Sequence, residues 1–326
     1  MKALLCEQFA EVERLTVRDI EPLRAGQGQV RVSIYAASLN YPDALMVQGL
    51  YQAKPALPFV PGSEYAGVVV EAGAGVTAFK PGDRVIAFGS LGGFAEEGVV
   101  DASRVAHLPA EMDFDVGAAL VVAYCTTLRG LKDCAHMQPG ETLLVLGAAG
   151  GVGLAAVEIG KAMGARVIAA ASTADKLALC REHGADELIN YATENLRERL
   201  NELTQGRGVD VVYDPVGGPY TELAFRSTGW RGRLVVVGFA AGDIPKLPVN
   251  LCLLRERTLI GVFWGDSLKH DPQSQDRNLA QLMQWIAEGK IKPHIDERVP
   301  LAQTPQLMKR MLARSVKGKV VVLPQA

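Results

Sequence analysis

The sequence predicts an α/β fold in which a doubly wound parallel sheet accompanies a smaller β-rich domain. At 326 residues the chain exceeds the length that one hydrophobic core usually supports, which favours two domains. Short alternating segments broken by Gly and Pro fill its first third. From Glu141 onward, continuous apolar strands alternate with amphipathic helices, which indicates a parallel sheet covered on both faces.

In the first third, alternating apolar residues predict strands, and between Asp113 and Leu131 the apolar spacing becomes helical. The expected strands are Gln29–Tyr35, Glu64–Glu71, Arg84–Ala87 and Glu97–Val100.

The alternation in the second part is regular, and no long linker interrupts it. The expected strands are Thr142–Leu146, Arg166–Ala170, Glu187–Ile189, Asp210–Tyr213, Leu234–Gly238 and Thr258–Val262. The expected helices are Val152–Met163, Ala174–His183, Leu196–Thr204 and Tyr220–Ser227. A polar stretch then extends to Arg277, followed by a helix at Leu279–Glu288 and a closing strand at Lys319–Leu323.

Charge and composition restrict the expected partners and location. A formal net charge of −2 gives no electrostatic reason to expect nucleic acid or anionic lipid as the main partner. The N-terminal segment reaches Glu7 before an apolar signal region could form, and no apolar run approaches the roughly 18 residues of a membrane span. We therefore expect a cytoplasmic protein without a membrane partner.

A glycine-rich turn, Gly147-Ala-Ala-Gly-Gly-Val-Gly153, lies directly between a predicted strand and a predicted helix. This context is typical of a Rossmann dinucleotide site, because glycine lets the backbone approach the pyrophosphate and the helix N-terminus offers unpaired N–H groups. Gly150 suits the close approach and Gly153 suits the packing of helix on strand. The residues expected to bind the cofactor here are Ala149, Gly150, Gly151 and Val152.

The choice of nicotinamide cofactor depends on the residues that end the second strand, where an acidic residue would bind a ribose 2′-hydroxyl. Ser172 and Thr173 occupy that turn, and Lys176 adds positive charge one helical turn later. This pattern favours NADPH over NADH, although Asp175 would favour NADH if it faced the ribose.

Several motifs occur in order along the chain: Asn40-Tyr-Pro-Asp43, Pro61-Gly-Ser-Glu-Tyr-Ala-Gly67, Lys80-Pro-Gly-Asp-Arg84, the glycine-rich turn and Phe263-Trp-Gly265. With them the chain resembles the medium-chain dehydrogenase/reductase superfamily, and in particular its zinc-free quinone oxidoreductase branch, which includes the zeta-crystallins. The resemblance implies a GroES-like catalytic domain formed by both chain ends around the Rossmann domain. The implied boundaries are 1–122 and 263–326 for the catalytic domain and 123–262 for the NADP-binding domain, with the substrate between them.

The same resemblance assigns roles to individual residues. It implies that Asn40, Asp43 and Tyr51 lie near the substrate and nicotinamide, with Thr126 beside the nicotinamide. Around the 2′-phosphate it implies Ser172, Lys176 and Tyr191, and along the nicotinamide pocket it implies Phe239, Phe263, Trp264 and Lys319. It also implies a homodimer, because the apolar strand Thr258–Phe263 would otherwise leave an exposed sheet edge.

The residues that hold zinc in related alcohol dehydrogenases are missing from the matching positions. Gly62-Ser63-Glu64 stands where the zinc branch has Gly-His-Glu, and no cysteine occurs between Cys6 and Cys125. Alcohol oxidation without a Lewis acid would need another way to stabilise an alkoxide, whereas reduction of an electron-poor quinone or enone needs less help. We therefore expect zinc-free hydride transfer from NADPH to a quinone or an α,β-unsaturated carbonyl. Asn40, Tyr51 and Thr126 would position the acceptor oxygen, and the proton would come from Tyr51 or solvent.

Two alternatives remain open at this point. An enoyl-thioester (enoyl-CoA) reductase would share the fold and the hydride chemistry, but the sequence has no evident basic cluster for a phosphate-bearing carrier. A non-enzymatic NADPH-binding or RNA-binding protein of the zeta-crystallin type would need a basic patch, for which Arg226, Arg231 and Arg233 are candidates. The net charge argues against RNA as a partner.

Overall fold

The computed structural model describes residues 1–89 and 91–326, and these divide into two compact units. Unit 1 comprises Met1–Val122 and Ile295–Ala326, and unit 2 comprises Ala123–His294. The division between residues 122 and 123 coincides with the expected one. The return to the first domain begins at Ile295, so the expectation that it begins at residue 263 is wrong.

Unit 1 is built on a seven-stranded sheet in the order β14-β15-β3-β4-β5-β7, with β6 paired to β3. Its strands are β3 (Gln29–Leu39), β4 (Glu64–Ala72), β5 (Arg84–Phe88), β6 (Glu97–Asp101), β7 (Val105–His107), β14 (Ile295–Pro300) and β15 (Lys319–Leu323). A separate two-stranded sheet pairs β1 (Lys2–Leu5) with β2 (Thr16–Asp19). Its helices are α1 (Tyr41–Val47), α2 (Phe114–Leu120) and α11 (Thr304–Leu312), with short turns of 3-10 helix at 12–14, 102–104 and 301–303.

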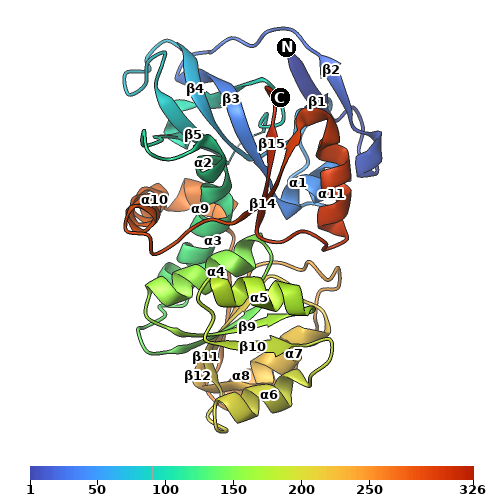
Figure 1. Ribbon diagram of the computed structural model, residues 1–326, viewed down its shortest axis with the longest axis vertical. Coiled ribbons are helices and arrows are strands. Elements are labelled where there is room, and N and C mark those ends of the chain that lie inside the picture. Colours follow the sequence, from blue (N-terminus) through green and yellow to red (C-terminus); the bar gives the residue numbers. More distant parts are fainter. Residues whose placement is uncertain (90) are drawn as a thin grey trace. The chain divides into compact units, whose positions relative to one another are not determined.

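Both ends of the chain contribute to one hydrophobic core in unit 1. Along β3 the alternate residues Val30, Val32 and Ile34 are fully buried, as expected for a strand with one face on the core. They share this core with Val320 and Val322 of β15. Figure 1 shows β15, from the C-terminal end, beside β3, and the register pairs Val320 with Leu39 in antiparallel fashion.

Unit 2 contains a six-stranded parallel sheet in the order β10-β9-β8-β11-β12-β13, which is the Rossmann order 3-2-1-4-5-6. Its strands are β8 (Thr142–Leu146), β9 (Arg166–Ala171), β10 (Glu187–Asn190), β11 (Val209–Asp214), β12 (Thr228–Val236) and β13 (Thr258–Gly261). The helices between strands are α4 (Gly151–Ala162), α5 (Ala174–Glu182), α6 (Leu196–Leu203), α7 (Pro219–Arg226) and α8 (Asn250–Leu253). Figure 1 shows α4 and α5 on one face of this sheet and α6, α7 and α8 on the other.

The segment after β13 is helical rather than an irregular polar stretch, which corrects the expectation for residues up to Arg277. It forms α9 (Trp264–His270) and α10 (Pro272–Ala287). The polar side chains of α10 bind a neighbouring helix of unit 2: Asn278 Nδ2 donates to Asp133 Oδ2 at 2.7 Å, and Arg129 pairs with Asp271 at 3.3 Å. These contacts explain why residues 263–294 belong to unit 2.

A continuous helical segment, Phe114–Cys134, begins in unit 1 and ends in unit 2. It consists of α2, a π-helical stretch (Val121–Cys125), α3 (Thr126–Leu128) and a second π-helical stretch (Arg129–Cys134). Within the described part of the chain, it alone is long and apolar enough to cross a membrane by length and composition. The expectation that no such run exists is therefore wrong. Most of its apolar window, 67%, is buried inside the protein, as in a core helix.

Candidate functional site

The glycine-rich turn of unit 2 joins the end of β8 to the start of α4. Gly147 has φ of 57°, a left-handed conformation that favours glycine. A Cβ on Gly153 would lie 2.3 Å from the carbonyl oxygen of Gly147, so only glycine fits there, whereas a Cβ on Gly150 would meet only that oxygen, at 3.5 Å. Helix α4 begins after Gly150 with no capping side chain and no acidic residue in its first turn, which suits an anion.

Ser172 and Tyr191 lie beside this turn, at the carboxyl edge of the sheet. Ser172 follows β9, the neighbour of β8, and the backbone N–H of Tyr191 donates to the carbonyl of Ala171 at 3.1 Å. The ring of Tyr191 packs on that of Tyr220, with centroids 4.4 Å apart. Because parallel strands present their carboxyl ends at one edge, the structure brings these expected phosphate-site residues together.

Asp175 does not extend freely toward a ribose position. Its carboxylate accepts a 2.5 Å hydrogen bond from the hydroxyl of Thr173 in the first turn of α5. Lys176 follows in the same turn and is partly exposed. The carboxylate of Asp175, which would favour NADH if it faced the ribose, is therefore bound by Thr173 at the N-terminus of α5.

Thr126 lies next to a residue that connects three elements of unit 2. The hydroxyl of Thr127 contacts the carbonyl of Ala123 at 2.8 Å, the carbonyl of Val152 in α4 at 3.3 Å and the hydroxyl of Tyr213 in β11 at 2.8 Å. These contacts fix the helical turn that carries Thr126 relative to the glycine-rich turn.

The aromatic residues expected along the nicotinamide pocket differ in exposure. Phe239 and Phe263 expose 37% and 55% of their surface, whereas Trp264 is buried. The indole Nε1 of Trp264 donates to Gln275 Oε1 at 2.8 Å, and Gln275 Nε2 donates to the sulfur of Cys125 at 3.4 Å. Gln275 thus links Trp264 to the residue before Thr126, a connection that the sequence did not indicate.

In unit 1 the expected substrate residues gather around a buried polar cluster. Asn40 precedes α1 and is nearly buried, and its backbone N–H donates to Asp43 Oδ2 at 2.8 Å. Its side chain contacts Glu64 and Lys319, and these two form an ion pair at 3.0 Å with side-chain exposures of 0% and 3%. Lys319 therefore belongs to unit 1 together with Asn40.

Burial raises the pKa of Asp43 to about 7, and the negative charge of Glu64 adds to this effect. Hydrogen bonding from the Asn40 backbone and the Ser63 side chain, together with the Lys319 charge, acts in the opposite direction. The pKa of Tyr51 is also raised, first by burial and then by the charge of Asp43, which places the two groups near each other. The Asp43 carboxyl, whose pKa burial raises, therefore interacts electrostatically with the Tyr51 hydroxyl.

Glu64 was missed as a candidate, although the sequence contained a signal for it. An acidic residue opens a strand whose next residues are apolar, and such a buried carboxylate needs partners. Its Oε2 accepts the backbone N–H of Val122 at 2.8 Å, so its contacts involve residues far apart in the sequence.

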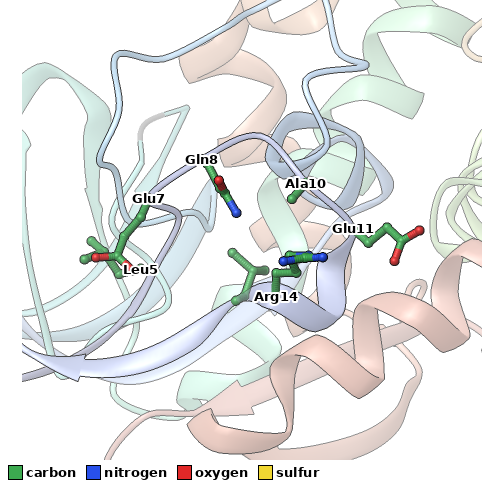
Figure 2. A pocket seen from close by; sticks show the side chains of 7 residues that line it. Leu5, Glu7, Gln8, Ala10, Glu11 and Arg14 are labelled. Atoms are coloured by element: carbon green, nitrogen blue, oxygen red, sulfur yellow. The ribbon is translucent and has the colours of Figure 1, made fainter.

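The described residues contain a further hollow but no metal-binding cluster. Among residues 1–89 and 91–326, no group of three or more His, Cys, Asp or Glu side chains has the arrangement needed to hold a metal ion. A pocket of about 290 Å³ lies in unit 1. Figure 2 shows Glu7, Gln8, Glu11 and Arg14 among the side chains that line it. None of its lining residues belongs to the Asn40 cluster.

The two units and their sites define a class of protein: a nicotinamide-dependent medium-chain dehydrogenase/reductase. Family models agree, since residues 26–110 match the alcohol dehydrogenase GroES-like domain and residues 151–288 match the zinc-binding dehydrogenase family.

The chain is similar along its whole length to quinone oxidoreductases. It is 38% identical to quinone oxidoreductase-like protein 2 homolog of Nematostella vectensis, covering 98% of this chain and 88% of that protein. It is also 38% identical to a quinone oxidoreductase of Pseudomonas aeruginosa, covering 96% of each. The crystal structure of Escherichia coli quinone oxidoreductase complexed with NADPH is 28% identical and superposes with a TM-score of 0.92, covering 99% of this chain and 100% of that one.

The chain therefore belongs to the quinone oxidoreductase branch of the medium-chain dehydrogenase/reductase superfamily, a branch of oxidoreductase enzymes.

Proposed function

We propose that the protein binds NADPH and transfers hydride to a quinone or an α,β-unsaturated carbonyl without zinc. The choice of NADPH rests on the glycine-rich turn at 147–153, which has Ser172 and Tyr191 at the same edge of the sheet. It also rests on Asp175, whose carboxylate accepts a hydrogen bond from Thr173. The relative from Escherichia coli was solved with NADPH, which supports the same choice here. When bound, NADPH supplies the hydride, and the chain's residues bind, orient and protonate.

The unit 1 cluster supports a reaction that does not use zinc. Glu64 follows Ser63 at the position where the zinc branch has histidine before glutamate, and its charge is compensated by the ammonium of Lys319. Asn40 and Tyr51 supply neutral hydrogen-bonding groups, which suit a carbonyl or quinone oxygen. Asp43, beside Tyr51, has a pKa suited to holding a proton near neutral pH.

The test is the absorbance of NADPH and NADH at 340 nm with EDTA-treated protein and 1,4-naphthoquinone, a simple enone or crotonyl-CoA. We expect NADPH to be oxidised with the quinone or the enone and the rate to be unchanged by added zinc. Turnover with crotonyl-CoA alone would instead support an enoyl-thioester reductase. Tight NADPH binding without turnover of any acceptor would support the non-enzymatic alternative.

We also propose that the protein is a homodimer that pairs through the β13 edge of unit 2. This end of the unit exposes large apolar side chains: Ile244, Val249, Leu253, Leu254 and Leu259. These residues lie in the segment that leads into β13 and in β13 itself, and β13 is an edge strand of the sheet, which favours pairing with a second strand there. Light scattering should give twice the mass of one chain, and Leu253→Lys should give monomers. The matched change Leu50→Lys, at an exposed leucine of unit 1, should leave the dimer intact.

A further inference from the structure

The side-chain amide of Asn40 is held between two oppositely charged side chains in unit 1. Lys319 Nζ donates to Asn40 Oδ1 at 2.6 Å, and Asn40 Nδ2 donates to Glu64 Oε1 at 2.9 Å. Lys319 also donates to the same Glu64 oxygen at 3.0 Å, which closes a ring of three contacts. All three residues are at least nine-tenths buried.

The register of the sheet explains why these residues meet. Ser38 of β3 pairs with Glu64, the first residue of β4, and Leu39 of β3 pairs with Val320, which follows Lys319 in β15. Asn40 follows directly after β3, so the three side chains lie at one end of three adjacent strands. Their arrangement is therefore fixed by backbone pairing on both sides of β3.

The ring permits one orientation of the Asn40 amide. A lysine ammonium only donates hydrogen bonds, and an ionised carboxylate only accepts them. Rotating the amide by half a turn would direct its NH2 group at the Lys319 ammonium and its oxygen at the Glu64 carboxylate. Both contacts would then be repulsive in a buried environment, where electrostatic interactions are strong.

This orientation determines what Asn40 offers a ligand. Its oxygen is occupied by Lys319, and one N–H is occupied by Glu64. The second N–H has the carbonyl of Ser38 within reach only at 3.5 Å, the outer limit of a hydrogen bond. The group can therefore donate one further hydrogen bond, and Lys319 strengthens that donor by polarising the amide.

We propose that Lys319 and Glu64 are positioning residues that hold Asn40 as a hydrogen-bond donor to the oxygen of the acceptor carbonyl or quinone. This inference rests on the proposed function and specifies how the acceptor is recognised. It predicts a preference for acceptors with a bare carbonyl oxygen, since the oriented N–H cannot accept a hydrogen bond from a hydroxyl group.

The test compares Lys319→Met with Lys309→Met. Lys309 also pairs with a glutamate of unit 1, Glu13, so Lys309→Met removes the same charge from the same unit. Its side chain is 67% exposed, so this control does not disturb a buried cluster. Because Lys319→Met leaves the Glu64 charge uncompensated and can impair folding, the double variant Lys319→Met/Glu64→Gln provides a second route that removes both charges. In Lys319→Met the Asn40 amide loses one of the two charged contacts that fix its orientation, and in the double variant it loses both charges.

Two readouts separate this inference from the proposed function. The first is selective ¹⁵N labelling of asparagine, assigned with Asn40→Ser, which reports exchange of the side-chain N–H protons without any turnover. We expect Asn40 to show one slowly exchanging and one faster proton in the native protein, at least tenfold faster exchange of the slow proton in the double variant, and a smaller increase in Lys319→Met, where Glu64 still accepts from Asn40. The second readout is kcat and KM for naphthoquinone together with NADPH affinity.

In the kinetic readout, the Lys319 variants should lose about ten- to a hundredfold in kcat/KM for the acceptor, while NADPH affinity and the Lys309→Met variant stay within twofold of the native protein. Unchanged N–H exchange in both folded Lys319 variants would overturn the inference, as would acceptor kinetics within twofold of native. If the native protein reduces no acceptor, the proposed function fails, and the exchange experiment still decides whether the ring orients Asn40.

Discussion

The hydroxyl of Tyr124 donates a 2.6 Å hydrogen bond to Glu158 Oε2, and both side chains are buried in unit 2. The other carboxylate oxygen contacts His183 Nδ1 at 2.7 Å and accepts the backbone N–H of Lys292 at 3.0 Å. Glu158 lies within α4, so this carboxylate ties the helix of the nucleotide turn to three other segments of the chain.

Tyr124→Phe should lower the free energy of unfolding by about 1–3 kcal/mol, because it leaves a buried carboxylate oxygen without its donor. Urea unfolding at neutral pH measures the change. Tyr35→Phe is the matched control, since Tyr35 is 47% exposed, and it should change stability by less than about 0.5 kcal/mol. Equal effects of the two substitutions would contradict the importance of this contact.

Two substitutions in the glycine-rich turn should separate folding from cofactor binding. Gly153→Ala places a methyl group against the carbonyl of Gly147 and should unfold the turn, lowering stability by several kcal/mol, roughly as for other severe backbone clashes. Gly150→Ala meets no such clash and should fold normally, yet its methyl group would obstruct the pyrophosphate. Thermal unfolding and NADPH titration of both variants check this. Normal NADPH affinity of Gly150→Ala would exclude the assigned role of that backbone.

The preference for NADPH should depend on Lys176. Lys176→Ala should weaken NADPH binding about tenfold, which corresponds to about 1.4 kcal/mol, and leave NADH binding unchanged. Titration of cofactor fluorescence with each nucleotide measures both affinities. Arg181→Ala, at the other end of α5, is the control and should affect neither cofactor. An equal loss of affinity for NADPH and NADH in Lys176→Ala would show that Lys176 does not recognise the 2′-phosphate.

Asp43 should make stability depend on pH. Its pKa in the folded protein, about 7, is above the ordinary value of 3.8, so the folded state retains a proton that the unfolded state has lost. The stabilisation is fully present below pH 3.8 and is lost as pH rises toward 7. Asp43→Asn should flatten this part of the curve of unfolding free energy against pH. Parallel curves for the two proteins from pH 4.5 to 8 would show that Asp43 is ionised throughout.

The sequence predicted the parts of the fold whose local pattern is strong. Strands β8 and β15 were placed with their observed bounds because each is a continuous apolar run. Strand β14 was missed, since Ile295-Asp-Glu-Arg-Val-Pro300 alternates weakly and carries three charges. The pattern up to Arg277 does not show α9 or the first part of α10, whereas the expected helix at Leu279–Glu288 lies largely within α10. Polar residues at the start of α10 bind a neighbouring helix instead of facing solvent, so apolar spacing does not mark this part of the helix.

The candidate site was predictable where one motif contains all its parts, as in the glycine-rich turn. The cluster around Asn40 was predictable only in part. Glu64 and Lys319 are 255 residues apart, and nothing near either residue indicates the other. Pairing of both β4 and β15 with β3 brings them together, which a local pattern does not show.

The two-ended construction of unit 1 has a consequence for synthesis on the ribosome. Unit 2 is one continuous segment, and all of it precedes β15, so it can fold while the C-terminal strands are still being made. Unit 1 cannot close its sheet until β14 and β15 arrive. Glu64 is synthesised 255 residues before Lys319, so its carboxylate stays without this partner during most of translation, and the incomplete first unit has an open sheet edge beside β3 until β15 pairs with it.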